Sequence, residues 1–400
     1  MSTSEALSWY LPARSDSCPF DPPIELRAQG GVRRVRIWDG SSPWVITDYH
    51  QARDALSNDL LSIDPTYPGF PEKSPSMAVT MGKERNFRNL DNPAHDIQRR
   101  MLAPYFTIKR LEARRPKVQQ LVDELIDQML TREKPVDFVE ALALPLPALV
   151  ICDLLGIPYD DRAYFTEPSA RSMSDDSLED SAAAWDELFD YLARVVKRKL
   201  DQPGDDLISH LLNHHRQGDL TVDQVVDLSR LVLVGGHETT ANMIALSTLF
   251  LLRHPELLAE FRDCTDPARL ANGVEELLRI LSIAHAGRRR VALDDIEIGG
   301  QTIRAGDGVI IANNVADRDP AVFPDPDSFV FDRKEARSHL AFGYGIHQCL
   351  GQNLSRIELQ VVFPSLFGRL PTLELAIPFG EVNYKTSGSI YGVVDLPLTW

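Results

Sequence analysis

The chain has 400 residues, of which 44% are hydrophobic and 25% are charged, and these values are ordinary for a globular protein. Its formal net charge of −16 argues against nucleic acid and against anionic membrane surfaces as partners. Residues 1–20 contain no apolar run long enough for a signal peptide or a membrane anchor, so we expect a cytoplasmic protein. Because there is no internal repeat and no clear linker, we expect one domain over residues 1–400.

The predicted elements begin with a β-hairpin, in which residues 31–38 (GVRRVRIW) and 43–47 (PWVIT) flank the turn sequence DGSS. Residues 63–87 follow as a long, weakly patterned loop, and loops of this length in compact enzymes are usually functional lids or disordered segments. From about Tyr49 to Gly368 most segments have helical periodicity, broken by proline-rich loops. The pattern predicts a mainly α fold with small β-sheets.

The longest predicted helix runs from Thr221 to about Arg253. It begins with the capping box TVDQ, and at 1.5 Å per residue it would span roughly 50 Å, enough to cross the whole domain. Its middle contains two adjacent glycines, Gly235 and Gly236, each of which should cost about 1 kcal/mol relative to alanine. The glycines indicate either close helix packing or a space needed beside the helix.

A second β region follows Arg290. Residues 296–303 (IEIGGQTI) have a Gly-Gly pair between two alternating segments, and residues 308–314 (GVIIANN) come next. The last segment, residues 382–400 (VNYKTSGSIYGVVDLPLTW), is typical of a further short hairpin. The predicted strands therefore belong to small sheets in a mostly helical domain.

One cysteine lies in the glycine-rich segment AFGYGIHQCLGQNLSR, residues 341–356. Leu354, Ile357 and Val361 recur at helical spacing after it, which places Cys349 near a helix N-terminus, where backbone N–H groups favour a thiolate. The four cysteines lie far apart and form no CxxC pair, which disfavours a zinc site or a disulfide framework. A thiolate here could be a nucleophile, or a ligand to a metal whose other ligands come from a cofactor.

Three further patterns are weak when each is taken alone. Glu276 and Arg279 in EELLR, and His95 and Arg99 in HDIQR, have spacings that bring two side chains together on one helix face. The segment HETT at residues 237–240 does not fit the HExxH pattern of zinc proteases. Each pattern by itself is equally typical of a solvated or closely packed helix face.

In their order along the chain, however, these patterns resemble the cytochrome P-450 superfamily of haem-thiolate enzymes. The segment from Phe342 to Gly351 matches its cysteine loop, Phe-x-x-Gly-x-His/Arg-x-Cys-x-Gly, at every fixed position. GGHETT matches the acid–threonine motif of the long distal helix, and EELLR, FPDPDSF and HDIQR match three further segments. The resemblance covers nearly the whole chain, and it is strongest to soluble actinobacterial enzymes that hydroxylate drugs and secondary metabolites.

The resemblance implies haem b, with Cys349 as the axial thiolate that favours O–O cleavage. It implies that Glu238 and Thr239 are catalytic, the glutamate by relaying protons and the threonine by hydrogen-bonding the bound dioxygen. Glu276 and Arg279 would help to fix the cysteine loop. The implied cofactor-binding residues are His95, Arg99, Gly235, Gly236, Arg290, Phe342, His347 and Cys349.

The function that the resemblance implies is an O2-dependent monooxygenase of secondary metabolism, supplied with electrons by ferredoxin and ferredoxin reductase. An NADH-dependent nitric oxide reductase of the same fold is an alternative, although those enzymes lack an acid at the position of Glu238. A peroxide-using enzyme would usually have Arg-Pro in place of Glu238 and Thr239. A non-catalytic haem-binding gas sensor is the remaining alternative, and the intact acid–threonine pair argues against it.

The resemblance implies a small organic substrate, which the motifs do not identify. If Arg290 points toward a haem propionate, the strand period of two brings Arg288 and Ala286 to the same side, unless Gly287 breaks the alternation. Arg288 would then either contact a second propionate or bind an acidic oxygen of the substrate. The second interpretation predicts a polar or acidic substrate, because an unpaired charge in an apolar cavity is costly. The expected substrate contacts are Leu231, Met243, Ala286, Arg288 and Ile390.

Overall fold

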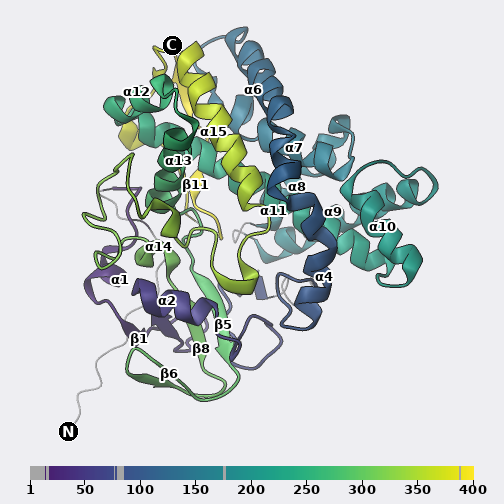
Figure 1. Ribbon diagram of the computed structural model, residues 1–400, viewed down its shortest axis with the longest axis vertical. Coiled ribbons are helices and arrows are strands. Elements are labelled where there is room, and N and C mark those ends of the chain that lie inside the picture. The colour runs from purple at the N-terminus through teal and green to yellow at the C-terminus, as the bar shows by residue number, and fades with distance from the viewer. Residues whose placement is uncertain (1–13, 15–17, 76, 79–84, 174–176, 387–388) are drawn as a thin grey trace.

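The structure of the protein is a computed structural model in which a helical part lies above a smaller part containing the largest sheet, in the view of Figure 1. This architecture confirms the predicted mainly α fold with small β-sheets. The structure describes residues 14, 18–75, 77–78, 85–173, 177–386 and 389–400.

The helices are short near the N-terminus and longer in the middle of the chain. Their bounds are α1 (Ile24–Ala28), α2 (Tyr49–Leu56), α4 (Ala94–Leu102), α5 (Ile108–Glu112), α6 (Arg115–Leu130), α7 (Pro145–Leu155), α8 (Thr166–Ser172), α9 (Leu178–Asp201), α10 (Leu207–Gln217), α11 (Val222–Leu252), α12 (Pro255–Asp263), α13 (Pro267–Leu281), α14 (Asn313–Ala316) and α15 (Gln352–Arg369).

The described strands form one sheet of five strands, in the order β1-β2-β8-β5-β3, together with smaller sheets that pair β10 with β11, β6 with β7, and β12 with both β4 and β9. Their bounds are β1 (Val32–Arg34), β2 (Trp44–Ile46), β3 (Leu61–Ser62), β4 (Val136–Asp137), β5 (Arg288–Ala292), β6 (Ile296–Ile298), β7 (Gln301–Ile303), β8 (Gly308–Ile311), β9 (Glu374–Leu375), β10 (Tyr384–Lys385), β11 (Gly392–Val393) and β12 (Pro397–Thr399).

All three predicted hairpins are confirmed. β1 and β2 are antiparallel, with Val32 opposite Ile46, and β10 and β11 are antiparallel near the C-terminus. β6 and β7 are joined by Gly299 and Gly300, whose φ angles of 57° and 73° suit glycine far better than any other residue. β8 pairs parallel with β2 and antiparallel with β5, so the five-stranded sheet joins segments from both ends of the chain.

The predicted long helix is α11, and its capping box is present. The Thr221 hydroxyl accepts a hydrogen bond from the Gln224 amide at 3.2 Å, and the Gln224 side chain accepts one from the Thr221 amide at 2.8 Å. Most residues of the C-terminal half are buried, which is why this helix has no single polar face. The helix passes through the middle of the molecule (Figure 1).

The hydrophobic core surrounds α11. Around its C-terminal half, α6, α13 and α15 contribute a cluster in which Leu246, Leu277 and Phe363 are fully buried. Around its N-terminal half, α7, α9 and α10 contribute a second cluster. A third cluster lies between the five-stranded sheet and α2. The long helix is therefore fixed by packing along its length, which is a requirement for a rigid wall of a binding site.

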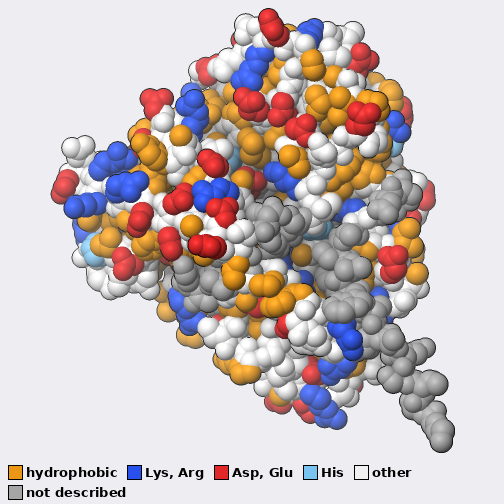
Figure 2. Space-filling view, turned by 180° about the vertical axis from the view of Figure 1, so that it is seen from behind, with side chains coloured by type: hydrophobic (Ala, Val, Ile, Leu, Met, Phe, Trp, Pro, Cys, Tyr) orange, Lys and Arg blue, Asp and Glu red, His pale blue; other side chains and the backbone are white. Residues whose placement is uncertain are grey.

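In the described residues, no single helix is long and apolar enough to cross a membrane. Two consecutive helical segments, Val139–Leu155 and Tyr159–Ser172, are long and apolar enough only when they are taken together. The chain bends by 111° between them. On the face of the molecule shown in Figure 2, acidic and basic side chains are intermixed and do not form one continuous basic field.

Candidate functional site

A cavity of about 400 Å³ lies between α11, the N-terminal part of α15, the cysteine loop (residues 341–351) and β5. The described parts of residues 63–87 and 165–195 and the turn that contains Ile390 also contribute to its wall. Residues 76, 79–84 and 174–176 of those segments lie outside the described residues. The lining is largely apolar, and it includes Ile63, Phe87, Trp185, Leu231, Met243 and Ile390.

The cysteine loop is a tight backbone turn. Gly343 and Gly345 have φ angles of 73° and 74°, and a Cβ on Gly345 would lie 2.9 Å from the Leu56 carbonyl oxygen. The amide of Cys349 donates a hydrogen bond to the Phe342 carbonyl at 2.9 Å. The loop therefore closes on itself and presents both Cys349 and Phe342 to the cavity.

Of the four cysteines, all of which the structure describes, Cys349 alone lines the cavity. Its accessible surface faces this enclosed space, so the side chain is open to the cavity and yet surrounded by protein. Burial raises the pKa of the Cys349 thiol, although the Gly351 amide and the guanidinium groups of Arg288 and Arg99 act to lower it. Desolvation therefore opposes the charged form of the thiol, while the backbone donor and the guanidinium groups favour it.

Four cationic or potentially cationic side chains line the cavity near the cysteine loop: Arg99, Arg288, Arg290 and His347. Arg99 reaches the loop by donating from Nη2 to the Gln348 carbonyl at 2.6 Å. Burial, and then the neighbouring Arg288, lower the pKa of Arg290 to about 10. Burial, Arg290, His95 and Arg99 together lower the pKa of His347 to about 3. This end of the cavity thus has a concentration of positive charge that disfavours any further cation.

His95 on α4 is fully buried behind this cluster and is not among the described residues that line the cavity. Its ring centroid lies 4.4 Å from that of His347, and its Nδ1 atom lies 3.0 Å from an oxygen of Asp96. Its Nε2 atom is buried and has no hydrogen-bond partner in the described structure. Burial lowers the pKa of His95 below its ordinary value.

The residues around the cavity fit haem b. A thiol faces the enclosed, largely apolar space, as an axial ligand must. The two propionates of haem would balance the charge of Arg99, Arg288 and Arg290, which have no carboxylate partner among the described residues. They would also supply acceptors near the orphaned Nε2 of His95 and Nε of Arg288.

The two glycines of α11 have different surroundings. A Cβ on Gly235 would have no atom within 4 Å, so this position opens onto the cavity. A Cβ on Gly236 would lie 2.6 Å from the Cδ1 atom of Ile151, so this position permits close packing with α7. Both interpretations of the glycine pair were therefore correct, one for each residue. Thr239 lines the cavity one turn after Gly235 and donates its hydroxyl hydrogen to the Gly235 carbonyl at 2.7 Å.

Glu238, in contrast, does not point into the cavity. Its side chain is buried, and its Oε2 atom accepts a hydrogen bond from Asn242 Nδ2 at 3.2 Å and lies 3.7 Å from Lys385 Nζ on β10. Its Oε1 atom has no hydrogen-bond partner in the part of the chain that the structure describes. Successive residues of a helix point in directions about 100° apart, so Glu238 and Thr239 face different surroundings.

The geometry agrees with comparisons with known proteins. A family model described as cytochrome P-450 matches residues 158–372. The chain is 45% identical to cytochrome P-450 GfsF of Streptomyces halstedii, over 99% of this chain and 97% of that protein. It is also 45% identical to pentalenic acid synthase of Streptomyces avermitilis, over 96% of each chain. The crystal structure of GfsF superposes with a TM-score of 0.92 at 44% identity, covering 99% of this chain and 100% of the other.

The chain belongs to the cytochrome P-450 family. It is a P-450 monooxygenase, and its cofactor is haem b with an axial cysteine thiolate. The identification made from the sequence is thereby confirmed, as is its placement near the actinobacterial enzymes.

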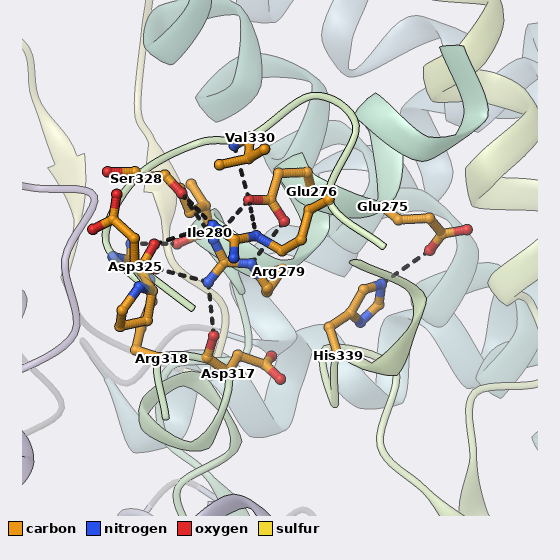
Figure 3. Close-up of polar contacts among 12 residues, drawn as sticks. Glu275, Glu276, Arg279, Ile280, Asp317, Arg318, Asp325, Ser328, Val330 and His339 are labelled. Carbon is orange, nitrogen blue, oxygen red and sulfur yellow. Dashed lines mark hydrogen bonds and ion pairs between the residues drawn. The ribbon is translucent and has the colours of Figure 1, made fainter. Parts of the chain in front are cut away.

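In this P-450 the predicted ion pair of Glu276 and Arg279 is present and fully buried, at 2.7 Å (Figure 3). Arg279 also donates to the carbonyls of Asp317 and Ser328, and Arg333 adds a second ion pair to Glu276 at 2.7 Å. These contacts fix residues 317–333 against α13.

The direct tie from α13 to the cysteine loop comes from the neighbouring Glu275, which sequence reasoning missed. Its carboxylate accepts hydrogen bonds from His339 at 3.0 Å and from Arg356 at 2.8 and 3.0 Å (Figure 3 shows the first). His339 precedes the loop and Arg356 lies on α15, which follows it. The available sequence signal was the pair of consecutive glutamates in EELLR, and the structure shows that both side chains are buried.

The P-450 cavity contains four of the five expected substrate contacts, namely Leu231, Met243, Arg288 and Ile390. Ala286 is buried and is not among the described residues of the lining. Arg288 and Arg290 do share one side of β5, but Gly287, with a φ of 75°, ends the alternation before Ala286. The expectation for Ala286 was therefore wrong. Lining residues without any sequence signal include Phe106, Ile151, Trp185, Ser282 and Glu358.

Proposed function

We propose that this P-450 inserts one oxygen atom from O2 into a small, polar product of secondary metabolism, with electrons from a ferredoxin and its reductase. The observation that carries the proposal is that Cys349 and Thr239, on different elements, face one largely apolar cavity. The names of relatives support the substrate class. One at 40% identity is a 20-oxo-5-O-mycaminosyltylactone 23-monooxygenase of Streptomyces fradiae, and a solved structure at 38% identity is a hydroxylase bound to mycinamicin VIII.

In the proposed arrangement Cys349 is the axial ligand, and Phe342 and the glycines of the loop give it a close, rigid support. Arg99, Arg290 and His347 bind the propionates, and His95 supports His347 from behind. We place Arg288 in the same set, because its Nη2 atom donates to the Ala341 carbonyl in the cysteine loop at 3.2 Å. This contact favours the propionate interpretation of Arg288 over direct substrate binding.

Haem supplies the activation of dioxygen and the oxidation of the substrate when it is bound. The surface of α11 at Gly235 leaves space beside it, and Thr239 adds one hydroxyl. Because that hydroxyl already donates its hydrogen to the Gly235 carbonyl, its lone pairs are left to accept a hydrogen bond from a ligand in the cavity. Glu238 would receive protons on the side of α11 that faces Lys385, whose side chain is partly exposed.

Cationic side chains away from the cysteine loop bind the polar groups of the substrate. Lys73, Arg88 and Arg230 line the cavity together with Trp185. Arg230 forms a buried ion pair with Asp227 at 2.9 Å and stacks on the Trp185 ring at 4.5 Å. Such a wall suits a substrate that has oxygen acceptors, because cationic side chains can donate charge-assisted hydrogen bonds to them.

The test is to compare the parent protein with Cys349→Ser and with the matched control Cys264→Ser, which changes a cysteine outside the cavity. The parent and the control should bind haem, show the long-wavelength ferrous–CO Soret band of a thiolate ligand, and oxidise substrate when ferredoxin, reductase and O2 are supplied. Cys349→Ser should lose that band. A parent chain without the band, or one that consumes NADH with nitric oxide in the absence of ferredoxin, would contradict the proposal.

A further inference from the structure

Arg14 is a buried arginine near the N-terminus that none of the roles above uses. It is 8% exposed, and its Nη2 atom donates hydrogen bonds to the carbonyls of Leu281 at 2.6 Å and of Ser282 at 2.9 Å. Its Nη1 atom donates to the Phe20 carbonyl at 2.8 Å. Burial lowers the pKa of Arg14 to about 10, so the side chain keeps its charge at neutral pH. This cation therefore joins the N-terminal part of the chain to the end of α13 by charge-assisted hydrogen bonds.

The end of α13 leads into a turn of the cavity wall. The helix ends at Leu281, and the three residues after it, 282–284, line the cavity. Ser282 has a φ of 31°, in the left-handed region that residues other than glycine seldom adopt, so the turn is strained. The last carbonyls of a helix have no partner within the helix, and a cation beside them also interacts favourably with the helix dipole. The two hydrogen bonds from Arg14 thus offset the strain of this turn.

A second turn of the cavity wall packs on the same arginine. Ile390 lines the cavity, and the next residue, Tyr391, is 2% exposed and has its ring centroid 4.7 Å from the guanidinium carbon of Arg14. This distance is typical of a cation–π contact. The Tyr391 amide also donates to the Ile283 carbonyl at 2.9 Å, which ties the two turns to each other. Arg14 itself is not among the described residues that line the cavity, so it acts on a ligand through the two turns.

We propose that Arg14 is a positioning residue that sets the shape of the substrate cavity, and this inference rests on the proposed function. It holds residues 282–284 through two carbonyls and the turn at Ile390 through the Tyr391 ring, so this wall is rigid before a substrate enters. A rigid wall lowers the ordering cost of binding and limits the orientations that a substrate can adopt. The N-terminal part of the chain thereby contributes to specificity from outside the cavity, although Arg14 and Leu281 are 267 positions apart in the sequence.

The first experiment measures the binding of imidazole and of 4-phenylimidazole to the haem-loaded protein by optical titration. Both probes bind the haem iron through a nitrogen atom, but only the second has a further ring that occupies the cavity. Arg14→Ala should weaken the binding of 4-phenylimidazole about fivefold, the scale at which a residue without ligand contact alters affinity, and should change imidazole binding by less than about twofold. Arg14→Lys should lie between the parent and Arg14→Ala, because lysine keeps the charge and loses the planar fork. The exposed Arg304→Ala is the control and should match the parent for both probes.

A purely structural role of Arg14 would give a different result. The melting temperature of Arg14→Ala would then fall, while the ratio of the two affinities would stay as in the parent, and this outcome would overturn the proposal. If Arg14→Ala does not bind haem, Arg14→Lys provides the same comparison.

The second experiment does not depend on haem or on the proposed function. Hydrogen exchange followed by mass spectrometry should be faster in both Arg14 variants than in the parent for residues 282–287 and 389–393, whereas residues 296–303 of β6 and β7 should keep the parent rate. Unchanged exchange in the two turns, or an equal rise in residues 296–303, would overturn the proposal. A parent without the thiolate CO band would instead overturn the proposed function, and the exchange comparison would still test whether Arg14 fixes the two turns.

Discussion

Replacing Glu275 by glutamine removes the charge that links α13 to both sides of the cysteine loop. The carboxylate is 1% exposed, and its partners are His339 and Arg356. Burial by itself would raise the pKa of Glu275, but hydrogen bonds from these two partners outweigh burial and lower it from 4.5 to about 2. Such a difference corresponds to about 3 kcal/mol of stability at neutral pH. This value agrees with the loss of about 3–5 kcal/mol of stability when one partner of a buried ion pair is removed.

The pH dependence gives the sharper test. Because the folded-state pKa lies below the ordinary value, the stabilisation is present above about pH 4.5 and is lost as the pH falls toward 2. Urea unfolding of the haem-loaded protein, followed by circular dichroism, should therefore show the difference between parent and Glu275→Gln shrinking by about 1 kcal/mol between about pH 7 and about pH 3.5. The exposed Glu133→Gln variant is the control. A difference that is the same at both pH values would refute the reasoning.

Three further substitutions test the loop, the distal helix and the buried network. Gly345→Ala should lower the melting temperature and the haem content, because residue 345 has a φ of 74° and its Cβ would lie 2.9 Å from a backbone oxygen of α2. The control is Gly368→Ala on α15, where a Cβ would meet open space, and this variant should be neutral or slightly stabilising. Thr239→Ala should retain haem and substrate binding while hydrogen peroxide per NADH rises, as measured by a peroxide assay beside product analysis. Arg279→Lys should lower the free energy of unfolding by about 3 kcal/mol, because lysine cannot reproduce the five-donor guanidinium contacts.

Much of the fold was predictable because its signals are local. The three hairpins have alternating segments around turn sequences, and the capping box at Thr221 fixed the start of α11. The sheet order was beyond such reasoning, since β2 pairs with β8 across more than 200 residues. The span of one domain over residues 1–400 and the cytoplasmic location stay predictions.

The site was predictable to the extent that its residues lie in motifs. Cys349, Thr239 and Arg99 line one cavity as the motif order indicated, and their roles toward haem stay predictions. The motifs did not indicate the direction in which each side chain points. Glu238 follows from the same motif as Thr239, yet helix geometry turns it toward Lys385. Glu358 lies beyond the cysteine motif, and only its burial and its missing partners draw attention to it.

The charges around the cavity explain why the site needs its cofactor to be complete. Arg99, Arg288 and Arg290 line one end, and burial lowers the pKa of each below its ordinary value, which means that the surroundings resist their charge. The only acidic side chain among the described lining residues is Glu358, whose pKa burial raises well above its ordinary value and which forms no ion pair with them. A group with two negative charges bound at this end would offset the repulsion among the three guanidinium groups, which no carboxylate of the described lining neutralises. The same cluster would therefore orient the cofactor and would make its binding part of the stability of the folded protein.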